Sequence, residues 1–178
     1  MDMNVIIRQE RTTDFTTAFN LIKLAFKNDK ISDYNEQLIV EELRKSTTFI
    51  PEFSLVAEFN NEIVGHILLT KINIKNNKQQ FVSLALAPVS VLPKHQRKGI
   101  GGQLIKKAHQ IAKKAGYKSI VVLGHENYYP KFGYQQAHKF GIKFPFKAPK
   151  ENCMVVELIK NGLQVVSGTV EYPKEFYL

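Results

Sequence analysis

The amino-acid sequence predicts one α/β domain of the α+β type, built on a mixed and mostly antiparallel sheet. Segments with strand and helix patterns follow one another in the order β-α-α-β-β-β-α-β-α-β. A glycine-rich loop joins one apolar strand to a long helix and then to another apolar strand, as in a parallel crossover. The 178 residues fit a single domain, with no linker or repeat.

The N-terminal third of the chain is predicted to contain one strand and two amphipathic helices. The expected elements are a strand over 4–8, a helix capped by Thr12 or Thr13 and running to Phe26, a polar connection over 27–33 and a helix over about 34–45. The second helix is expected to point Leu38, Ile39 and Leu43 inward.

Three successive strands are predicted to pair antiparallel in the middle of the chain. These strands cover residues 54–59, 63–74 and 81–91. Asn60-Asn61 is a turn dipeptide between the first two, so these should form a hairpin. Pro88 lies inside the third strand and cannot donate a ladder hydrogen bond, so we expect strand pairing to stop there.

The second half of the chain begins with the crossover. Its helix is expected over about 99–115, ending at Gly116, and its apolar strand over 119–124. The remaining elements expected are a short helical turn over 128–132, strands near 135–140 and 154–159, and a β-prone segment over 164–172.

The loop between Val91 and the crossover helix has the pattern Gln-x-x-Gly-x-Gly, from Gln96 to Gly101. Glycines allow the backbone to approach an anion closely, and the helix start points unpaired N–H groups and its positive dipole end at the same place. The pattern therefore predicts a phosphate-binding loop. On this motif alone, a glycine-rich helix start without a ligand remains the alternative.

Two other phosphate-binding loops are excluded by the neighbouring residues. A nucleotide P-loop has Lys and Ser or Thr after its last glycine, but here Gln103 and Leu104 follow Gly102. A dinucleotide-binding loop has a third glycine where Leu104 stands, and a carboxylate about 20 residues further on that is missing here.

The net charge of +9 is concentrated around this loop. Residues 63–125 contain eleven Lys and Arg residues and no Asp or Glu. Such a region attracts polyanions, of which coenzyme A and nucleic acid are two. Four lysines of the crossover helix could follow a nucleic-acid backbone, although a solvated helix face is the preferred interpretation: Lys106, Lys107, Lys113 and Lys114.

Cysteine content and hydropathy point to a soluble, cytoplasmic protein. The longest nearly apolar run, 84–93, is shorter than the roughly 20 residues that cross a bilayer, and residues 1–11 lack a signal-peptide core. Cys153 is the only cysteine, so no internal disulfide is possible and no metal site is expected. Cys153 itself is expected to be a core thiol.

Three motifs between Ile63 and Tyr134 resemble the GNAT superfamily of N-acetyltransferases. They are the loop just described, the strand Leu84 to Val91 with its break at Pro88, and the run Tyr-Tyr-Pro-Lys-Phe-Gly-Tyr over 128–134. Together with Val-Val-Leu-Gly-His over 121–125, they are similar to the YhbS-like branch of this superfamily. The resemblance implies the GNAT fold, whose sheet splays between its fourth and fifth strands and carries helices on both faces.

The resemblance implies that one domain over 1–178 binds acetyl-CoA, with its cofactor core over about 63–134 and C-terminal strands and a tail over 135–178. The pantetheine arm would insert beside the fourth strand, with the N–H of Val89 near the thioester oxygen. The loop would wrap the pyrophosphate. The implied cofactor-binding residues are Val89, Val91, Gln96, Arg97, Lys98, Gly99, Ile100, Gly101 and Gly102.

Tyr129 matches the position of the superfamily's tyrosine acid, which implies that it protonates the departing thiolate. The alternative role is a packing aromatic that lines the cofactor sulfur. The neighbouring Tyr128 is expected to belong to the core.

The general base and the acceptor are left open by the sequence. The fourth strand carries no glutamate, so the candidates for the base are Glu126, His125, His66 or a water chain. The first two helices and their connection would wall the acceptor site, and their carboxylates favour a cationic amine or are simply solvated: Asp29, Asp33, Glu36, Glu41 and Glu42.

Three function classes are compatible with these observations. The preferred one is an acetyl-CoA-dependent N-acetyltransferase acting on a small-molecule or peptide amine, as a monomer or homodimer with no membrane partner. The second is an acetyl-CoA sensor without turnover. The third is a nucleic-acid-binding module, which the absence of tryptophan and of aromatics interleaved with basic residues disfavours. The part played by residues 160–178 in the acceptor site is undetermined.

Overall fold

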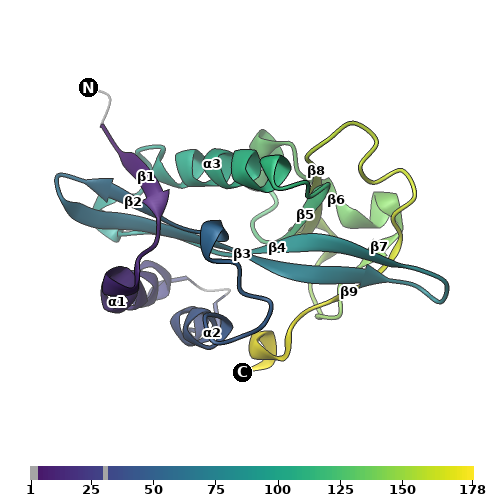
Figure 1. The fold of residues 1–178 in the computed structure, drawn as a ribbon, viewed down its shortest axis with the longest axis horizontal. Coiled ribbons are helices and arrows are strands. Elements are labelled where there is room, and N and C mark those ends of the chain that lie inside the picture. Colours follow the sequence, from purple (N-terminus) through teal and green to yellow (C-terminus); the bar gives the residue numbers. More distant parts are fainter. Residues whose placement is uncertain (1–3, 30–31) are drawn as a thin grey trace.

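The computed structural model describes residues 4–29 and 32–178, in which nine strands form one sheet (Figure 1). The hydrogen-bonded path runs β1-β2-β3-β4-β5-β8-β6, while β9 pairs with both β3 and β7. Only β4 with β5 and β7 with β9 are parallel among these described strands, which confirms the predicted mixed, mostly antiparallel sheet. The strands are β1 (Ile6–Gln9), β2 (Ser54–Phe59), β3 (Glu62–Lys75), β4 (Gln80–Val91), β5 (Ser119–Leu123), β6 (Gln135–Gln136), β7 (Ile142–Lys143), β8 (Cys153–Glu157) and β9 (Gly168–Glu171).

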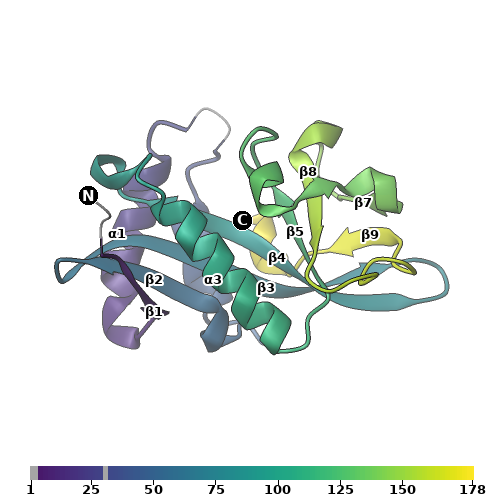
Figure 2. The same ribbon diagram turned by 90° about the horizontal axis from the view of Figure 1, so that it is seen from above.

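Helices cover both faces of the sheet, as the resemblance implies. α1 (Phe15–Phe26) and α2 (Glu36–Leu43) lie on one face, and α3 (Ile100–Lys114) crosses the other (Figures 1 and 2). Leu104 and Ile105 of α3 are fully buried in the core on its side, and Leu21 and Val40 pack on the opposite side. No helix in the described ranges is long and apolar enough to cross a bilayer.

The hairpin between β2 and β3 forms at the predicted dipeptide. Asn60 and Asn61 both have positive φ values, 50° and 61°. Asparagine tolerates this left-handed conformation, and two such residues in succession give the twist that a tight hairpin needs. The turn therefore fixes the register of two central strands.

The sheet opens between β4 and β5 where the proline predicted a break. Register partners on these parallel strands are limited to Leu84 with Ile120 and Ala85 with Val121. Beyond Ala85, β4 remains paired only with β3, across a bulge opposite Ile67–Leu69 that contains a cis Ala87-Pro88 peptide bond. The edge of β4 that faces β5 is therefore free of strand pairing from Leu86 to Val91.

The predicted buried face of α2 is confirmed for Leu43 and wrong for Leu38. Gln37, Val40 and Leu43 are buried, whereas Leu38 is 44% exposed and Ile39 is only half-buried. In a helix of two turns, apolar residues lie on two overlapping stripes, so helical spacing does not select one of them. The packing of α2 on α1 and β3 makes that choice.

Of the strands expected in the C-terminal region, the one near 154–159 is present as β8, whereas the one near 135–140 is much shorter than expected. The segment predicted over 135–140 is a two-residue strand, β6, followed by a 3-10 turn, Ala137–Phe140. The tail ends in another 3-10 turn, Lys174–Tyr177, which places Phe176 against the core of α1 and α2. The amide of Asn35, before α2, donates to the backbone oxygen of Leu178 at 3.1 Å. The tail thus supports the face of the sheet where α2 lies.

Candidate active site

The loop–helix junction, residues 96–102, presents backbone donors at one point. Arg97 and Gly99 have positive φ values, 61° and 83°, and Gly99 is the N-cap of α3. The first intrahelical donor is Gln103, whose N–H bonds Gly99 at 3.1 Å. In the described part of the chain no acceptor engages the N–H groups of Ile100, Gly101 and Gly102, which are free to bind an anion.

Two glycines of this junction are also required by packing. A Cβ at position 101 would lie 2.8 Å from the hydroxyl oxygen of Tyr128, and one at 102 would lie 3.3 Å from the ring of Phe132. Both aromatic residues belong to the Tyr-Tyr-Pro-Lys-Phe-Gly-Tyr motif. The two motifs singled out in the sequence therefore touch each other in space, and the glycines make that contact possible.

The free edge of β4 carries the two predicted pantetheine-binding residues. The N–H of Leu92 donates to Val64 of β3 at 2.9 Å. Because backbone groups of a strand alternate in direction, those of Val89 and Val91 point away from β3, toward the opening beside β5. The structure thus gives both residues the orientation that a pseudo-strand ligand requires.

The main chain of Gln96 was expected to contact a pyrophosphate, but its N–H and its side chain both bind within the protein. Its backbone N–H bonds Pro93 at 3.3 Å, and its side-chain amide donates to the carbonyl oxygen of Val91 at 3.1 Å. The side chain thus ties the junction to the end of β4. This contact had no signal in the sequence beyond the presence of an amide residue.

The charges around the junction are partly neutralised. Lys98 donates to the backbone oxygen of Lys94 at 3.0 Å, and Lys94 pairs with Glu62 at 2.7 Å. Arg97 and Lys98 remain exposed, so both can contact an anion at the junction. The lysines of α3 at 106, 107, 113 and 114 are exposed as well, in agreement with a solvated helix face.

Tyr129 is held in an aromatic cluster beside the opening. Its side chain is 7% exposed, and its ring meets those of Tyr128 and Tyr134 edge to face at 5.3 and 5.5 Å. A Cβ on Gly124 would overlap this ring, so the glycine after β5 makes room for it. Burial, with a smaller contribution from Tyr128, raises the pKa of Tyr129, which keeps the phenol protonated and able to donate.

Behind Tyr129 lies a second polar contact that the sequence did not predict. Tyr134 and Nε2 of His109 are hydrogen-bonded at 3.0 Å. Burial lowers the pKa of His109 to about 4, so the imidazole is neutral near pH 7. This pair fixes the position of Tyr134, whose ring supports Tyr129.

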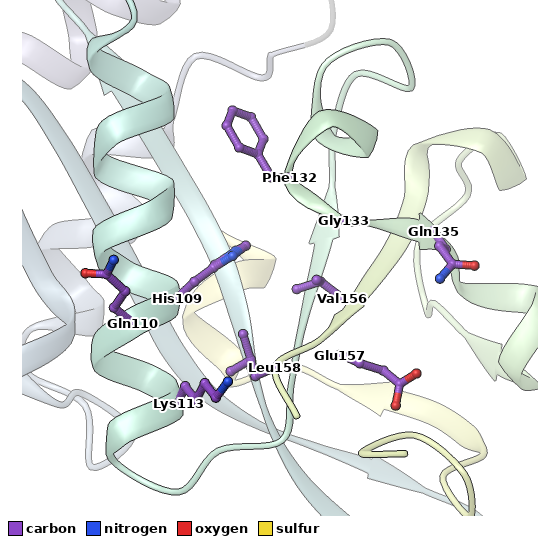
Figure 3. A pocket seen from close by; sticks show the side chains of 9 residues that line it. All are labelled: His109, Gln110, Lys113, Phe132, Gly133, Gln135, Val156, Glu157 and Leu158. Atoms are coloured by element: carbon purple, nitrogen blue, oxygen red, sulfur yellow. The ribbon is translucent and has the colours of Figure 1, made fainter. Parts of the chain in front are cut away.

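A hollow of about 370 Å³ lies beside His109, between α3, the Tyr129–Phe132 turn and β8 (Figure 3). The side chains of Lys113, Gln135 and Glu157 also line it. His109 is ten residues into α3 from Gly99, roughly 15 Å along the helix axis. The hollow is therefore separate from the loop–helix junction.

The candidate bases lie in three different environments. His125 is 59% exposed in its side chain and pairs with Asp29 at 3.7 Å, which links the end of β5 to the connection after α1. Glu126 is exposed on the same loop. His66 is completely buried on β3, beneath α1 and α2.

The carboxylates expected near the acceptor do not form one group. Glu42 pairs with Lys45 at 2.7 Å on the surface, and Glu36 accepts a hydrogen bond from Ser32. Asp33 and Glu41 are exposed, and only Asp29 approaches the end of β5. Residues 30–31 of the same predicted connection lie outside the described residues.

The thiol of Cys153 lies in a different environment from the one predicted. The described residues hold no group of three or more His, Cys, Asp or Glu placed around a metal ion. Cys153 begins β8 half-buried rather than in the core, and burial raises the pKa of its thiol. Because a thiol is a good nucleophile only when ionised, this cysteine is a poor one.

Comparison with known proteins agrees with this geometry. Residues 51–136 match the acetyltransferase (GNAT) domain model. The uncharacterized N-acetyltransferase YjhQ of Escherichia coli K12 is 33% identical over 149 residues, which cover 82% of this chain and 80% of that protein. The chain belongs to the GNAT acetyltransferase family. The matched domain contains β4, the junction and the Tyr129 turn.

Solved structures of GNAT proteins share the whole fold. YhbS of Escherichia coli, solved in complex with CoA, has a TM-score of 0.88 at 22% identity, and the match covers 99% of this chain and 93% of that one. A GNAT family acetyltransferase from Brucella melitensis, solved with acetyl-CoA, has a TM-score of 0.80 at 28% identity and covers 98% and 99%. The GNAT fold therefore extends through the C-terminal strands.

Proposed function

We propose that this protein is an acetyl-CoA-dependent N-acetyltransferase that moves the acetyl group directly to a primary amine, from one domain over residues 1–178. The observation that carries the proposal is the continuity of two sets of backbone donors. Val89 and Val91 face the open edge of β4, and Ile100 to Gly102 present N–H groups at the start of α3. A pantetheine arm ending in a diphosphate has acceptors that match both sets. The GNAT relatives solved with CoA and acetyl-CoA support this ligand.

The reaction divides between the backbone of β4 and the side chain of Tyr129. The amine nitrogen attacks the thioester carbon, and the N–H of Val89 donates to the oxygen on which charge develops. As the C–S bond breaks, the phenol of Tyr129 gives its proton to the thiolate. A second group removes the proton of the amine. Tyr129 is protonated at neutral pH and therefore has a proton to give, although burial raises its pKa and makes the phenol a weaker acid.

A two-stage experiment tests this proposal. Thermal unfolding is measured with acetyl-CoA, CoA and an oligonucleotide at low and high salt, since a ligand that binds the native state raises the midpoint. Thiol release from acetyl-CoA is then followed over a panel of amines. Stabilisation by CoA with turnover of an amine supports the proposal. Stabilisation without turnover of any amine indicates a sensor, and stabilisation by the oligonucleotide alone would overturn it.

A further inference from the structure

A buried polar cluster lies on the face of the sheet that α1 and α2 cover, and its member on β3 pairs with β4 on the side opposite the open edge. It consists of Glu10, Arg44, Ser54 and His66, which come from four separate parts of the chain. Arg44 donates to the two oxygens of Glu10 at 2.5 and 3.3 Å, and its side chain is 7% exposed. The side chains of Glu10 and His66 are completely buried.

The hydrogen bonds of this buried cluster have a definite direction. Ser54 donates to Glu10 at 2.6 Å, which uses its only proton. Its oxygen lies 3.2 Å from Nε2 of His66 and must therefore accept from it. When the ring of His66 holds a single proton, that proton is on Nε2 and the lone pair is on Nδ1.

Nδ1 of His66 and the hydroxyl of Ser90 are both buried, and neither has a partner among the described residues. His66 and Ser90 are register partners on β3 and β4, so their side chains stand on the same face of the sheet. The Cβ atoms of such partners are about 5 Å apart. Buried polar atoms are satisfied in native proteins, so two such atoms side by side mark a place for a shared polar partner.

Ser90 lies between Val89 and Val91, whose backbone groups face the opening. The side chain of Ser90 stands on the same face of the sheet as His66 and Leu68, and Leu68 packs in the core of α1 and α2. The proposed thioester position lies beside the neighbouring Val89. The other candidate histidine, His125, is engaged with Asp29 and lies at the end of β5.

We propose that Ser90, directly or through one water, takes the proton of the acceptor amine and passes its own to Nδ1 of His66. The inference rests on the proposed function. One N–H bond of the ammonium breaks, one N–H bond forms on His66, and no other bond changes. Glu10, 3.5 Å from Nε2, stabilises the resulting imidazolium, while Arg44 is the other charged group of the buried cluster. Ser90 acts on the substrate, and His66 is a positioning residue that acts through it.

The first test measures the proton on His66 without any substrate. Nitrogen NMR of protein labelled at its five histidines distinguishes the two tautomers, and His66→Gln assigns the signal. We expect the Nε2–H tautomer, with an Nδ1 resonance that shifts in Ser90→Ala. Thr70→Val is the matched control, because Thr70 is another buried hydroxyl of β3 without a partner among the described residues, opposite Ala85. An Nδ1–H ring, or equal shifts in both variants, would overturn the inference.

The second test compares two acceptor probes of nearly the same shape. Benzylamine is protonated near neutral pH and must lose one proton before it attacks, whereas O-benzylhydroxylamine attacks as the neutral amine. Both then lose one N–H proton to solvent as the tetrahedral intermediate collapses, so the probes differ only in the first proton. We expect Ser90→Ala to lower kcat with benzylamine by roughly 100-fold, the scale of a lost general base. Its kcat with O-benzylhydroxylamine should be unchanged, as should both values in Thr70→Val.

The outcomes separate this inference from the proposed function. Equal losses of Ser90→Ala on both probes would show a structural role for Ser90 and overturn the relay while leaving the transferase intact. If the wild-type protein acetylates neither probe, the proposed activity fails for these amines. The tautomer of His66 and its response to Ser90→Ala then decide whether the Ser90–His66 contact exists.

Discussion

The loop–helix junction and the buried cluster differ in how their polar groups are satisfied. At the junction, the N–H groups of Ile100, Gly101 and Gly102 have no acceptor among the described residues. In the buried cluster, Glu10 and Arg44 meet in a pair that excludes water. Unpaired donors are tolerated at a surface where water or a ligand can bind them, but a buried charge requires a partner. The first region therefore leaves backbone donors available, as the proposed ligand site requires, and the second holds a permanent contact.

One atom of the buried cluster, Nδ1 of His66, has no partner among the described residues. His66 is bound on one ring nitrogen and open on the other, at the point where the cluster reaches Ser90 on β4. A cluster that only stabilised the fold would be expected to have a partner for Nδ1 of His66 as well. Strand β4 connects the two regions. Its Ser90 pairs with His66 of the buried cluster, and its last residue, Val91, leads toward the loop–helix junction.

The largest expected effect on stability is that of breaking the buried pair. Glu10→Gln leaves the charge of Arg44 buried without its partner, which should lower the free energy of unfolding by about 3–5 kcal/mol. Urea denaturation measures this change. Glu42→Gln removes a surface partner of Lys45 and should leave the urea midpoint unmoved. Equal shifts in the two variants would contradict the distinction between the regions.

The Glu10–Arg44 pair should also make the free energy of unfolding depend on pH in the acid range. Burial alone would raise the pKa of Glu10, but contacts with His66 and Ser54 and the charge of Arg44 outweigh it and lower the pKa to about 2. A carboxyl whose pKa is lower in the folded state stabilises the protein above its ordinary value of 4.5. This stabilisation is lost as the pH falls from 4.5 toward 2, and Glu10→Gln should lack that loss.

Loss of the phenol acid should affect the chemical step alone. Tyr129→Phe keeps the ring contacts and removes the proton donor, so we expect turnover to fall roughly 10- to 1000-fold with little change in CoA affinity. Steady-state kinetics and CoA titration measure the two quantities. Tyr117→Phe, which alters a tyrosine packed on Phe53 away from the opening, is the control. Equal turnover in Tyr129→Phe and wild type would leave Tyr129 a packing residue.

The His109–Tyr134 pair should make stability depend on pH in a higher window. Burial lowers the folded-state pKa of His109 from its ordinary value of 6.5 to about 4, so the unfolded chain binds more protons between these two pH values. Stability should fall by up to about 3 kcal/mol as the pH drops from 6.5 to 4. Urea denaturation of His109→Gln, which can still bond Tyr134, should show a flatter profile. An unchanged slope would assign the effect to another group.

The smallest effect concerns the packing of the junction. Gly101→Ala places a methyl group 2.8 Å from the Tyr128 hydroxyl, which should displace the helix start and weaken CoA binding by roughly tenfold, about 1.4 kcal/mol. The double variant with Tyr128→Phe should recover most of that affinity. Calorimetric titration with CoA measures both. Without recovery, the glycine serves the ligand directly rather than the contact with Tyr128.

Local sequence features predicted the elements of this protein well where they depend on short-range chemistry. Asn60-Asn61 indicated the hairpin, and Pro88 indicated the end of pairing between β4 and β5. The family resemblance implied the fold and the role of Tyr129. The inward position of Leu38 in α2 and the extent of β6 were predicted wrongly, because both are decided by distant segments that pack on them.

The polar contacts that tune the site had no sequence signal. Gln96 reaches back to Val91, and His109 reaches Tyr134 across 25 residues. The separation of His109 from Tyr134 is closed only by folding, and the contact of Gln96 with Val91 depends on the conformation of the loop between them. Single histidines and glutamines are ordinary surface residues in most chains, so composition does not distinguish them.

The order of elements, the glycine loop and the strand break were determined by the sequence alone, because backbone preferences of Gly, Asn and Pro act within a few residues. Only the tertiary structure decided that the glycines face an aromatic turn, that Tyr129 is buried enough to stay protonated, and that Glu10 meets His66. Burial and long-range contact set the pKa values and hydrogen-bond directions on which the proposed chemistry depends. The contacts of the buried cluster, for example, form only when the four chain segments that hold its residues have packed together.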